Sequence, residues 1–303
     1  MSDDFPEMDM PDFDPKLARR AVRRGLLRTT SYVLAVLLTL VLVATVGSTL
    51  VQERGGRERR MMDVLGTAFK LYNPGYTVAT GECCETTPLS MSFKVSAIPV
   101  EPAAERSSSH DTFTISQSFF GRVGHLPLGN TANTRLSISL YSVGGTLAQK
   151  EEVRKVLARL PDRLMALAVV EFAAPLKEPE LKGFLEQYKT CADKVVYERR
   201  TGSVPITWGE ITWDRGAFNE GKDGCGVGLA NFRSWVSLLR DHDDANLRSF
   251  DLSLARLRKA AGDGLAYAYV DQLQTIEELR TLIEDPRVRT VRLADVAFDL
   301  DRP

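Results

Sequence analysis

The four cysteines of this 303-residue chain carry its clearest covalent chemistry. They are Cys83, Cys84, Cys191 and Cys225. An even number of cysteines favours structural disulfide bonds in an oxidising compartment, with free or redox-active thiols as the alternative. A direct bond between the neighbours Cys83 and Cys84 would close a strained ring. We therefore expect each of these two to join a distant cysteine, or Cys191 to pair with Cys225, and both pairings stay open.

Histidines and acidic residues are the other candidates for catalysis or metal binding. None of His110, His125 and His242 has a metal-ligand spacing to another histidine, and no Cys-x-x-Cys pair is present. The acidic run around His242, residues 241–244, could bind a cation, but we expect a solvated loop there. Residues 107–111 contain the residue types of a Ser-His-Asp triad, yet triads assemble from separate segments of a fold. The sequence therefore predicts no catalytic residue, no metal site and no cofactor.

Two further motifs have plain structural interpretations. Residues 224–228 are rich in glycine but lack the Lys-Ser/Thr ending of a phosphate-binding loop, so we interpret them as a loop around a bridged cysteine. Trp208 and Trp213 could face a ligand, but we expect them to fill a core.

The start of the chain interleaves acidic and apolar side chains. The residues that we expect to contact a partner protein are Phe5, Met8, Asp9, Met10, Asp12 and Phe13. A segment of this length cannot fold alone, but it can become ordered when it docks on a basic surface. The alternative is an unstructured acidic leader without a partner.

An uncharged segment, residues 29–52, follows this start and predicts a transmembrane helix. At about 1.5 Å per residue it covers roughly 36 Å, against a hydrocarbon core of roughly 30 Å. The alternative is a cleaved signal peptide. The apolar run is too long for one, and Gly47-Ser48 makes a poor cleavage site.

The charges that flank this segment predict its orientation, because cytoplasmic ends carry an excess of lysine and arginine. The preceding side has Lys16 and the membrane-orienting residues Arg19, Arg20, Arg23, Arg24 and Arg28, with no acidic residue among them. On the following side, four arginines are accompanied by Glu53 and Glu58. We expect a cytoplasmic N-terminus and an extracytoplasmic bulk, where disulfides persist. The basic residues also have a simpler role, which is binding to anionic lipid.

Composition indicates what each side can form. Residues 1–28 cannot bury a core, whereas the residues beyond 52 can form one large or two small domains. The formal net charge is −1 and 44% of the residues are hydrophobic. These values indicate a globular domain and argue against direct nucleic-acid binding.

The region after the span predicts a helix and then strands. Apolar residues recur at helical spacing over 57–72, and Asn73-Pro74-Gly75 ends that helix. Residues 77–141 are rich in Thr, Ser and Val, with period-two fragments at 112–115 and 135–141, so we expect short strands broken by loops. Residues 101–110 are interpreted as an exposed connector.

Two segments about 100 residues apart repeat a strand-helix-strand pattern. The first unit has strands at 164–173 and 194–198 around a helix at 177–188, and the second has strands at 265–271 and 288–293 around a helix at 275–284. Thr275 and Glu278 form a capping box. Further helices are expected at 231–240 and 245–261. The prediction is an α+β domain in which helices cover a mixed sheet, as in ferredoxin-like arrangements.

In this order of elements the chain resembles the membrane-anchored sigma factor regulators, also called anti-sigma factors. The resemblance rests on the basic stretch and span followed by residues 71–74, on residues 160–162 leading into 166–172 with Pro175, and on residues 275–279 leading into 288–293. Family members carry a "PDxxVAELxISFxxPY" run at the middle position and close with a "TPEELxxL" helix. The resemblance covers most of residues 20–300 and implies regulation of an extracytoplasmic-function sigma factor. Many members have a folded cytoplasmic domain, some with a zinc motif, but residues 1–28 contain neither His nor Cys.

The expected organisation is a cytoplasmic tail (1–28), a transmembrane helix (29–52), a juxtamembrane helix (53–75) and an extracytoplasmic sensor or interaction domain (76–303). The first functional hypothesis is a single-pass regulator whose tail restrains a sigma factor while the outer domain senses the envelope. The second is a bitopic scaffold that binds other proteins of the envelope or division machinery. The third is an anchored enzyme, which we do not expect. The oligomeric state, the signal and the cognate sigma factor are not predicted.

Overall fold

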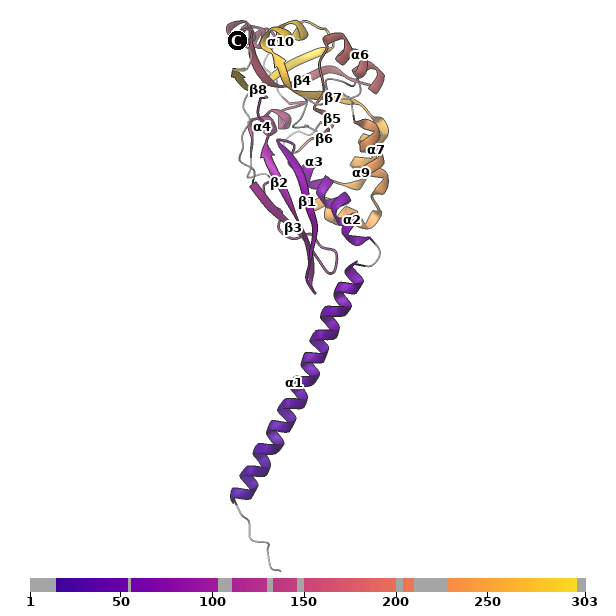
Figure 1. Ribbon diagram of the computed structural model, residues 1–303. Helices are drawn as coiled ribbons and strands as arrows, with labels where there is room; N and C mark the ends of the chain where they lie inside the picture. The colour runs from indigo at the N-terminus through magenta and orange to yellow at the C-terminus, as the bar shows by residue number, and fades with distance from the viewer. Residues whose placement is uncertain are drawn as a thin grey trace, which may run out of the picture. The chain divides into compact units, whose positions relative to one another are not determined.

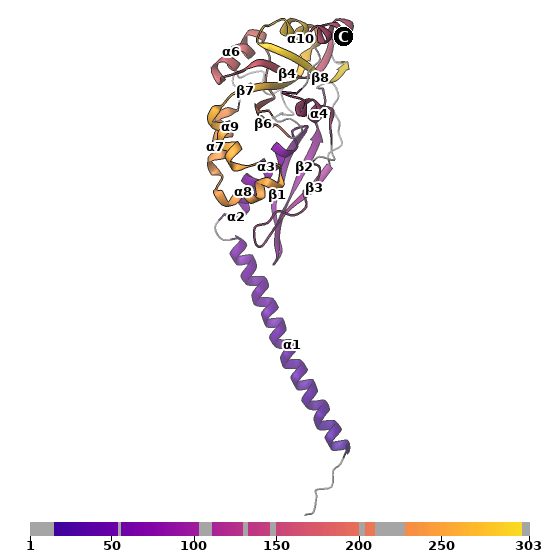
Figure 2. The same ribbon diagram turned by 180° about the vertical axis from the view of Figure 1, so that it is seen from behind.

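The computed structural model describes residues 15–53, 56–102, 111–129, 133–145, 150–199, 204–209 and 228–298. The chain forms two compact units, Met1–Val51 and Gln52–Pro303. Figures 1 and 2 show their elements from two opposite sides.

The first unit consists of the long helix α1 (Pro15–Glu53). Its segment Val22–Ser48 is long and apolar enough to cross a membrane, and its side chains are exposed in the absence of one. The hydroxyl groups of Thr29, Ser31, Thr39 and Thr45 donate to backbone carbonyls one turn back in the same helix. These polar groups are therefore satisfied without water, as a helix in lipid requires.

The second unit begins with a continuous helical segment over residues 57–72, which confirms the helix expected there. It consists of α2 (Arg57–Met61), a π-helical turn η1 (Met62–Gly66) and α3 (Thr67–Tyr72). The side chains that recur at helical spacing are buried: Met61, Val64, Leu65, Ala68, Phe69 and Leu71.

This helical segment packs on a three-stranded antiparallel sheet. The strands are β1 (Tyr76–Thr86), β2 (Ser90–Pro99) and β3 (Asp111–Ser118), in the order β1-β2-β3. Alternate residues of β2, from Met91 to Ala97, are buried, as expected for a sheet with one face on the core. The predicted strands in this region are thus confirmed between residues 76 and 118, and residues 103–110 of the expected connector lie outside the described residues.

The strand predicted at residues 135–141 is wrong, because these residues form the helix α4 (Arg135–Tyr141). Thr134 and Ser137 build a capping box, which satisfies the free N–H groups of its first turn. Leu136, Ser137 and Leu140 are buried, a spacing that fits one helix face as well as the alternation fits a strand.

The second sheet confirms the α+β class and both strand-helix-strand units. The first strand-helix-strand repeat consists of β4 (Leu164–Leu176), α6 (Glu178–Tyr188) and β5 (Lys194–Glu198). The second repeat consists of β7 (Ala266–Thr275), α10 (Ile276–Ile283) and β8 (Val288–Phe298). With β6 (Ile206–Trp208), the order is β6-β5-β7-β4-β8. The two repeats interlock in a ferredoxin-like order. β7 of the second repeat lies between β5 and β4, and β4 of the first repeat lies between β7 and β8. Every described neighbour pair is antiparallel, so the expectation of a mixed sheet is wrong.

Both faces of this sheet are covered. α5 (Lys150–Arg159), α6 and α10 contribute to the core on one face, together with Ala166, Ala168 and Val170 of β4. α4 packs on the other face against Leu167 and Val169. Residues 164–172 of β4 are consequently all buried, which explains their nearly continuous apolar run.

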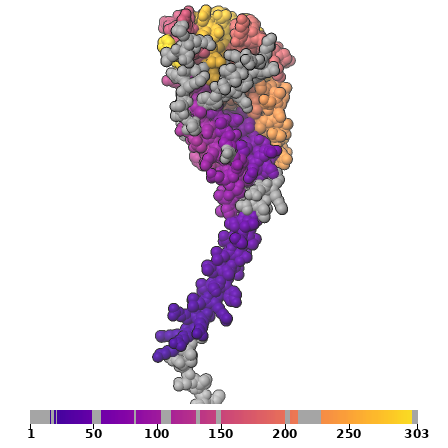
Figure 3. Space-filling model, viewed as in Figure 1, coloured from indigo at the N-terminus to yellow at the C-terminus, as the bar shows by residue number. Residues whose placement is uncertain are grey.

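A group of helices connects β6 to β7. It contains α7 (Leu229–Leu238), the 3-10 turn η4 (Asp241–Asp243), α8 (Asp244–Ser249) and α9 (Leu254–Asp263). The single helix expected at 245–261 is therefore two helices. The helix is interrupted at Asp251, which has a φ of 54°, and Ser253 is the N-cap of α9. In Figure 3 the orange surface of α7 and α9 lies beside the purple surface of residues 56–100.

Gly75 offers a test of this packing, because a methyl group there would lie 2.0 Å from Thr134 Oγ1 and 3.1 Å from Ser137 Cβ. Gly75→Ala should lower the free energy of unfolding by about 1–3 kcal/mol through this overlap. The matched control is Gly183→Ala on α6, where nothing lies within 4 Å. That change should raise stability by about 0.5–1 kcal/mol, because alanine favours a helix interior. Urea unfolding of the full chain in detergent measures both, and equal effects would contradict the packing described here.

Candidate functional site

The predicted partner-binding residues lie outside the described residues. They are Phe5, Met8, Asp9, Met10, Asp12 and Phe13. Their role stays a prediction. The membrane-orienting residues Arg19, Arg20, Arg23, Arg24 and Arg28 all lie on α1 and are exposed.

The helical segment 57–72 is the site at which the large unit connects to α1, since α2 begins four residues after α1 ends. Polar contacts bind this segment to three other parts of the unit. Arg57 Nη2 donates to the carbonyl oxygens of Ser118 and Phe119, each at 3.1 Å. Arg60 forms an ion pair with Asp243 at 2.5 Å, and Trp235 Nε1 donates to the Asp63 carbonyl at 2.8 Å. The segment is therefore part of the folded unit rather than a free linker.

The turn that ends this segment, residues 73–76, is a second point of convergence. Asn73 Nδ2 donates to the Phe69 carbonyl at 3.0 Å, and Asn73 Oδ1 accepts from Gly129 N at 3.0 Å. The carbonyl of Gly75 accepts from Val100 N at 2.9 Å. One short turn thus connects α3, the end of β2 and the loop before α4.

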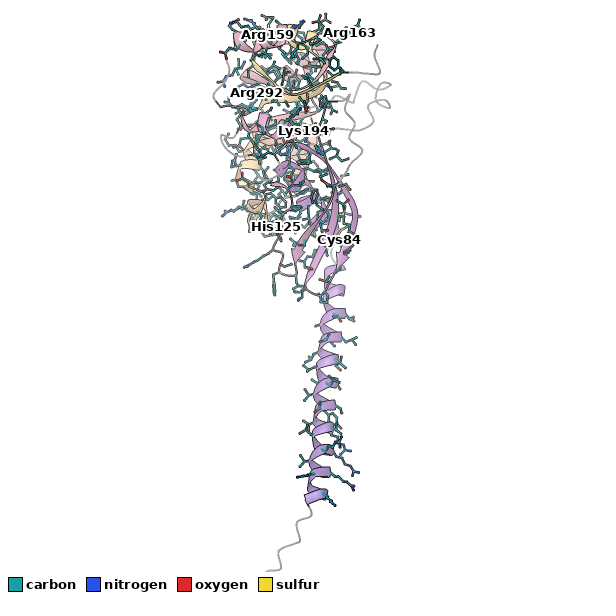
Figure 4. All side chains as sticks on the ribbon, turned by 90° about the vertical axis from the view of Figure 1, so that its left-hand side faces the viewer. Cys84, His125, Arg159, Arg163, Lys194 and Arg292 are labelled. Atoms are coloured by element: carbon teal, nitrogen blue, oxygen red, sulfur yellow. A yellow bond between two sulfur atoms is a disulfide. The ribbon has the colours of Figure 1, made fainter. Side chains whose placement is uncertain are left out.

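Lys194 joins the same turn to the five-stranded sheet. Its Nζ donates to the carbonyl oxygens of Pro74 and Tyr76, at 2.6 and 3.1 Å. The side chain is buried, and burial lowers the pKa of its ammonium group from 10.5 to about 7, with a smaller contribution from Lys70. Figure 4 labels Lys194 in the middle of the large unit, with His125 and Cys84 toward one end and Arg159 and Arg163 at the other.

A pocket of about 400 Å³ lies beside α2. Its lining includes Arg57, Arg60, Phe119, Phe120 and His242. The acidic run at 241–244 forms the turn η4 and the start of α8 rather than the expected solvated loop, and Asp243 is buried. Asp243 accepts hydrogen bonds from Arg60 and from Arg240 N, and Asp244 accepts from Leu254 N and Arg248. Within the described ranges no group of three or more His, Cys, Asp or Glu side chains is placed to hold a metal.

A buried ion cluster lies on the sheet face that α4 covers. Glu171 of β4 is fully buried and contacts Arg289 at 3.0 Å and Arg292 at 3.7 Å. Arg292 also donates to the Ser142 carbonyl at 2.8 Å, and burial lowers its pKa. Removing either arginine would leave a buried carboxylate with fewer partners, at a cost in stability, so the cluster fixes β8 against β4.

The disulfide pairing of the cysteines contradicts one of the two expectations. Cys83 and Cys84 are bonded to each other, so the expectation that each joins a distant cysteine is wrong. The peptide bond between them is cis, and their Cα atoms lie 3.1 Å apart. Cys191 is also disulfide-bonded. Cys225 lies outside the described residues.

Of the two tryptophans Trp208 and Trp213, the structure describes Trp208, and its role is packing. The ring of Trp208 lies 5.2 Å from Phe232 and 5.7 Å from Trp235. Trp208 therefore belongs to an aromatic cluster between β6 and α7, as expected. Trp213 and the glycine-rich stretch before Gly228 lie outside the described residues.

Sequence reasoning missed Lys194, Glu171 and the contacts of Arg57. Each is a charged residue in a region that reads as an ordinary strand or helix end, and lysine and glutamate are almost always exposed. The apolar run of β4 carried one usable signal for Glu171. It stands within an apolar run whose neighbours on both sides are buried, so a charge there requires a partner.

The lowered pKa of Lys194 predicts a specific pH dependence of stability. In the folded chain its proton is lost near pH 7, while the unfolded chain keeps the proton up to about pH 10.5. Stability contributed by this group therefore rises with pH across that window and is lost as the pH falls through 7. Relative to Lys194→Met, the wild-type chain should gain roughly 5 kcal/mol of unfolding free energy between pH 7 and pH 10.5.

Urea unfolding in detergent at several pH values measures this difference. Lys182→Met, on the exposed side of α6, controls for the loss of a lysine in general. A difference between wild type and Lys194→Met that does not change with pH would contradict the burial of this ammonium group.

The chain matches no protein-family model, no curated protein and no solved structure. What the protein does is therefore inferred from its own residues.

Proposed function

We propose that this protein is a membrane-anchored regulator of an extracytoplasmic-function sigma factor. In this proposal α1 crosses the membrane, the N-terminal tail restrains the sigma factor in the cytoplasm, and the large unit senses the state of the envelope. The observation that carries the proposal is α1 itself. One helix with an exposed apolar segment, Val22–Ser48, separates a short tail from a folded unit that begins at Gln52. Such a helix needs lipid around it, because its apolar side chains would otherwise face water.

The attachment of residues 57–72 to the large unit supports a sensing role. A signal can pass along a single helix only if the domain that receives it is mechanically connected to that helix. Here Arg57, Arg60 and Asp63 all bond to distant parts of the unit, and only three residues separate Arg57 from Glu53. Rearrangement of the unit would therefore move the chain immediately next to α1.

The charges on the two sides of α1 support a cytoplasmic N-terminus. Five exposed arginines lie between Pro15 and the uncharged segment. Two of the arginines on the other side, Arg57 and Arg60, are engaged within the folded unit. The N-terminal flank carries its five arginines with no acidic residue among them, as cytoplasmic flanks do.

The test replaces the apolar residues of the tail and keeps the anchor. Phe5, Met8, Met10 and Phe13 are changed to serine in the full chain, and the protein is captured from bacterial membranes with its bound partners identified by mass spectrometry. We expect the wild-type chain to capture a sigma factor and the variant to capture at least several-fold less of it. The variant lacks the apolar docking surface but keeps the negative charge of the tail.

The matched control carries the same kind of change on the large unit, at the exposed residues Ile138 and Val156. This control should capture the sigma factor as well as the wild type does. If neither the wild type nor the variants capture a sigma factor and all recover envelope proteins, the regulator is ruled out in favour of a bitopic scaffold. Equal capture by wild type and tail variant would show that the tail is not the contact.

A further inference from the structure

The two most exposed large apolar side chains among the described residues of the large unit lie together. Phe120 is 87% exposed and Leu89 is 77% exposed. Phe119 N donates to the Leu89 carbonyl at 2.7 Å, which joins the loop after β3 to the turn between β1 and β2. We call Leu89, Phe119 and Phe120 the apolar tip. In Figures 1 and 2 this end of the three-stranded sheet lies at the same end of the large unit as α2.

The exposure of Phe120 is built into the fold. Ser118 N donates to the Arg122 carbonyl and Gly121 N to the Ser118 carbonyl, each at 2.8 Å. The carbonyl of Gly121 also accepts from Gln117 Nε2 at 2.9 Å and from Asn246 Nδ2 at 2.8 Å. The loop is therefore fixed from both sides, and it holds a phenylalanine in contact with solvent. A rigidly presented apolar residue of this kind marks an interaction surface.

Arginines lie on the loop that forms the tip and on the adjoining helix α2. The Arg57 guanidinium lies 6.0 Å from the centre of the Phe119 ring. Arg59 and Arg122 are exposed on the neighbouring helix and loop. An apolar centre with arginines around it fits a lipid surface, where apolar side chains enter the headgroup region and cationic groups bind phosphate.

Chain length limits how far the tip can lie from the membrane. Arg57 follows Glu53, the last residue of α1, by four positions, and a chain of that length reaches at most about 14 Å. Arg57 itself bonds to the carbonyl oxygens of Ser118 and Phe119. If α1 crosses the membrane, the tip is held within a short distance of the leaflet at the C-terminal end of the helix, whichever orientation the protein has.

We propose that the apolar tip inserts into the headgroup region of that leaflet, and that Arg59 and Arg122 bind anionic lipid beside it. This inference rests on the proposed membrane crossing of α1. It assigns the large unit a second contact with the membrane, so that the unit is held by the tip and by the chain rather than by the chain alone.

The test measures the depth of the tip in vesicles of phosphatidylglycerol and phosphatidylcholine. The full chain carries a nitrobenzoxadiazole label on Phe120→Cys or, with Phe120 intact, on Leu89→Cys. Labelled wild type corrects for background, since Cys83, Cys84 and Cys191 are all in disulfides. We expect emission shifted to shorter wavelength and quenched by lipids that carry a spin label near the headgroup. The control label on Glu186→Cys, on exposed α6, should show neither effect.

The variant pair Arg59→Gln and Arg122→Gln should reduce the quenching in anionic vesicles and leave it unchanged in neutral ones. Water-like emission from both tip labels, equal to that of Glu186→Cys, would overturn the insertion while leaving the anchor intact. Vesicle flotation after alkaline carbonate treatment tests the anchor separately. A chain that does not float would overturn the anchor and the tip contact together.

Discussion

One buried ammonium group joins the two sheets of the large unit. Lys194 starts β5, yet its side chain ends on the turn at residues 73–76, which also fixes α3, β2 and the approach to α4. No apolar side chain could satisfy two carbonyl oxygens that point into the interior, so these carbonyls would be left without partners if the lysine were absent. This contact, together with the apolar core that they share, fixes the three-stranded sheet and the helical segment 57–72 against the five-stranded sheet.

The same chemistry recurs at several contacts between the helical segment and the rest of the unit. Arg57, Trp235 and Lys194 are long donors that bond to backbone carbonyl oxygens rather than to acidic side chains. A carbonyl acceptor is present whatever residue occupies its position. These attachments therefore depend on one side chain each, and they tolerate sequence change at the other partner. An ion pair such as Arg60–Asp243 depends on two.

Much of this fold is readable from the sequence, because its strongest signals are local. The apolar run of α1, the buried strand β4 and the capping box at Thr275 each follow from a few adjacent residues. Three features were beyond such reasoning. The alternation at 135–141 suits a strand and a helix equally until Thr134 is seen to cap it. The Cys83–Cys84 bond joins two neighbours, a pairing that we do not expect from the sequence, and the burial of Lys194 depends on carbonyl oxygens about 120 residues away. The predicted tail contact falls outside the described residues.

The outer strand β8 has a consequence for how copies of this protein behave near one another. It is eleven residues long and ends the five-stranded sheet, so it offers a row of backbone groups to any strand that approaches. Arg289, Arg292 and Asp295 interrupt it with charge, and two of them are already committed to Glu171. A second copy that tried to extend the sheet would have to bury these charges or displace the pairs. The ion cluster that stabilises one chain thus also discourages edge-to-edge aggregation when many chains are concentrated on a surface.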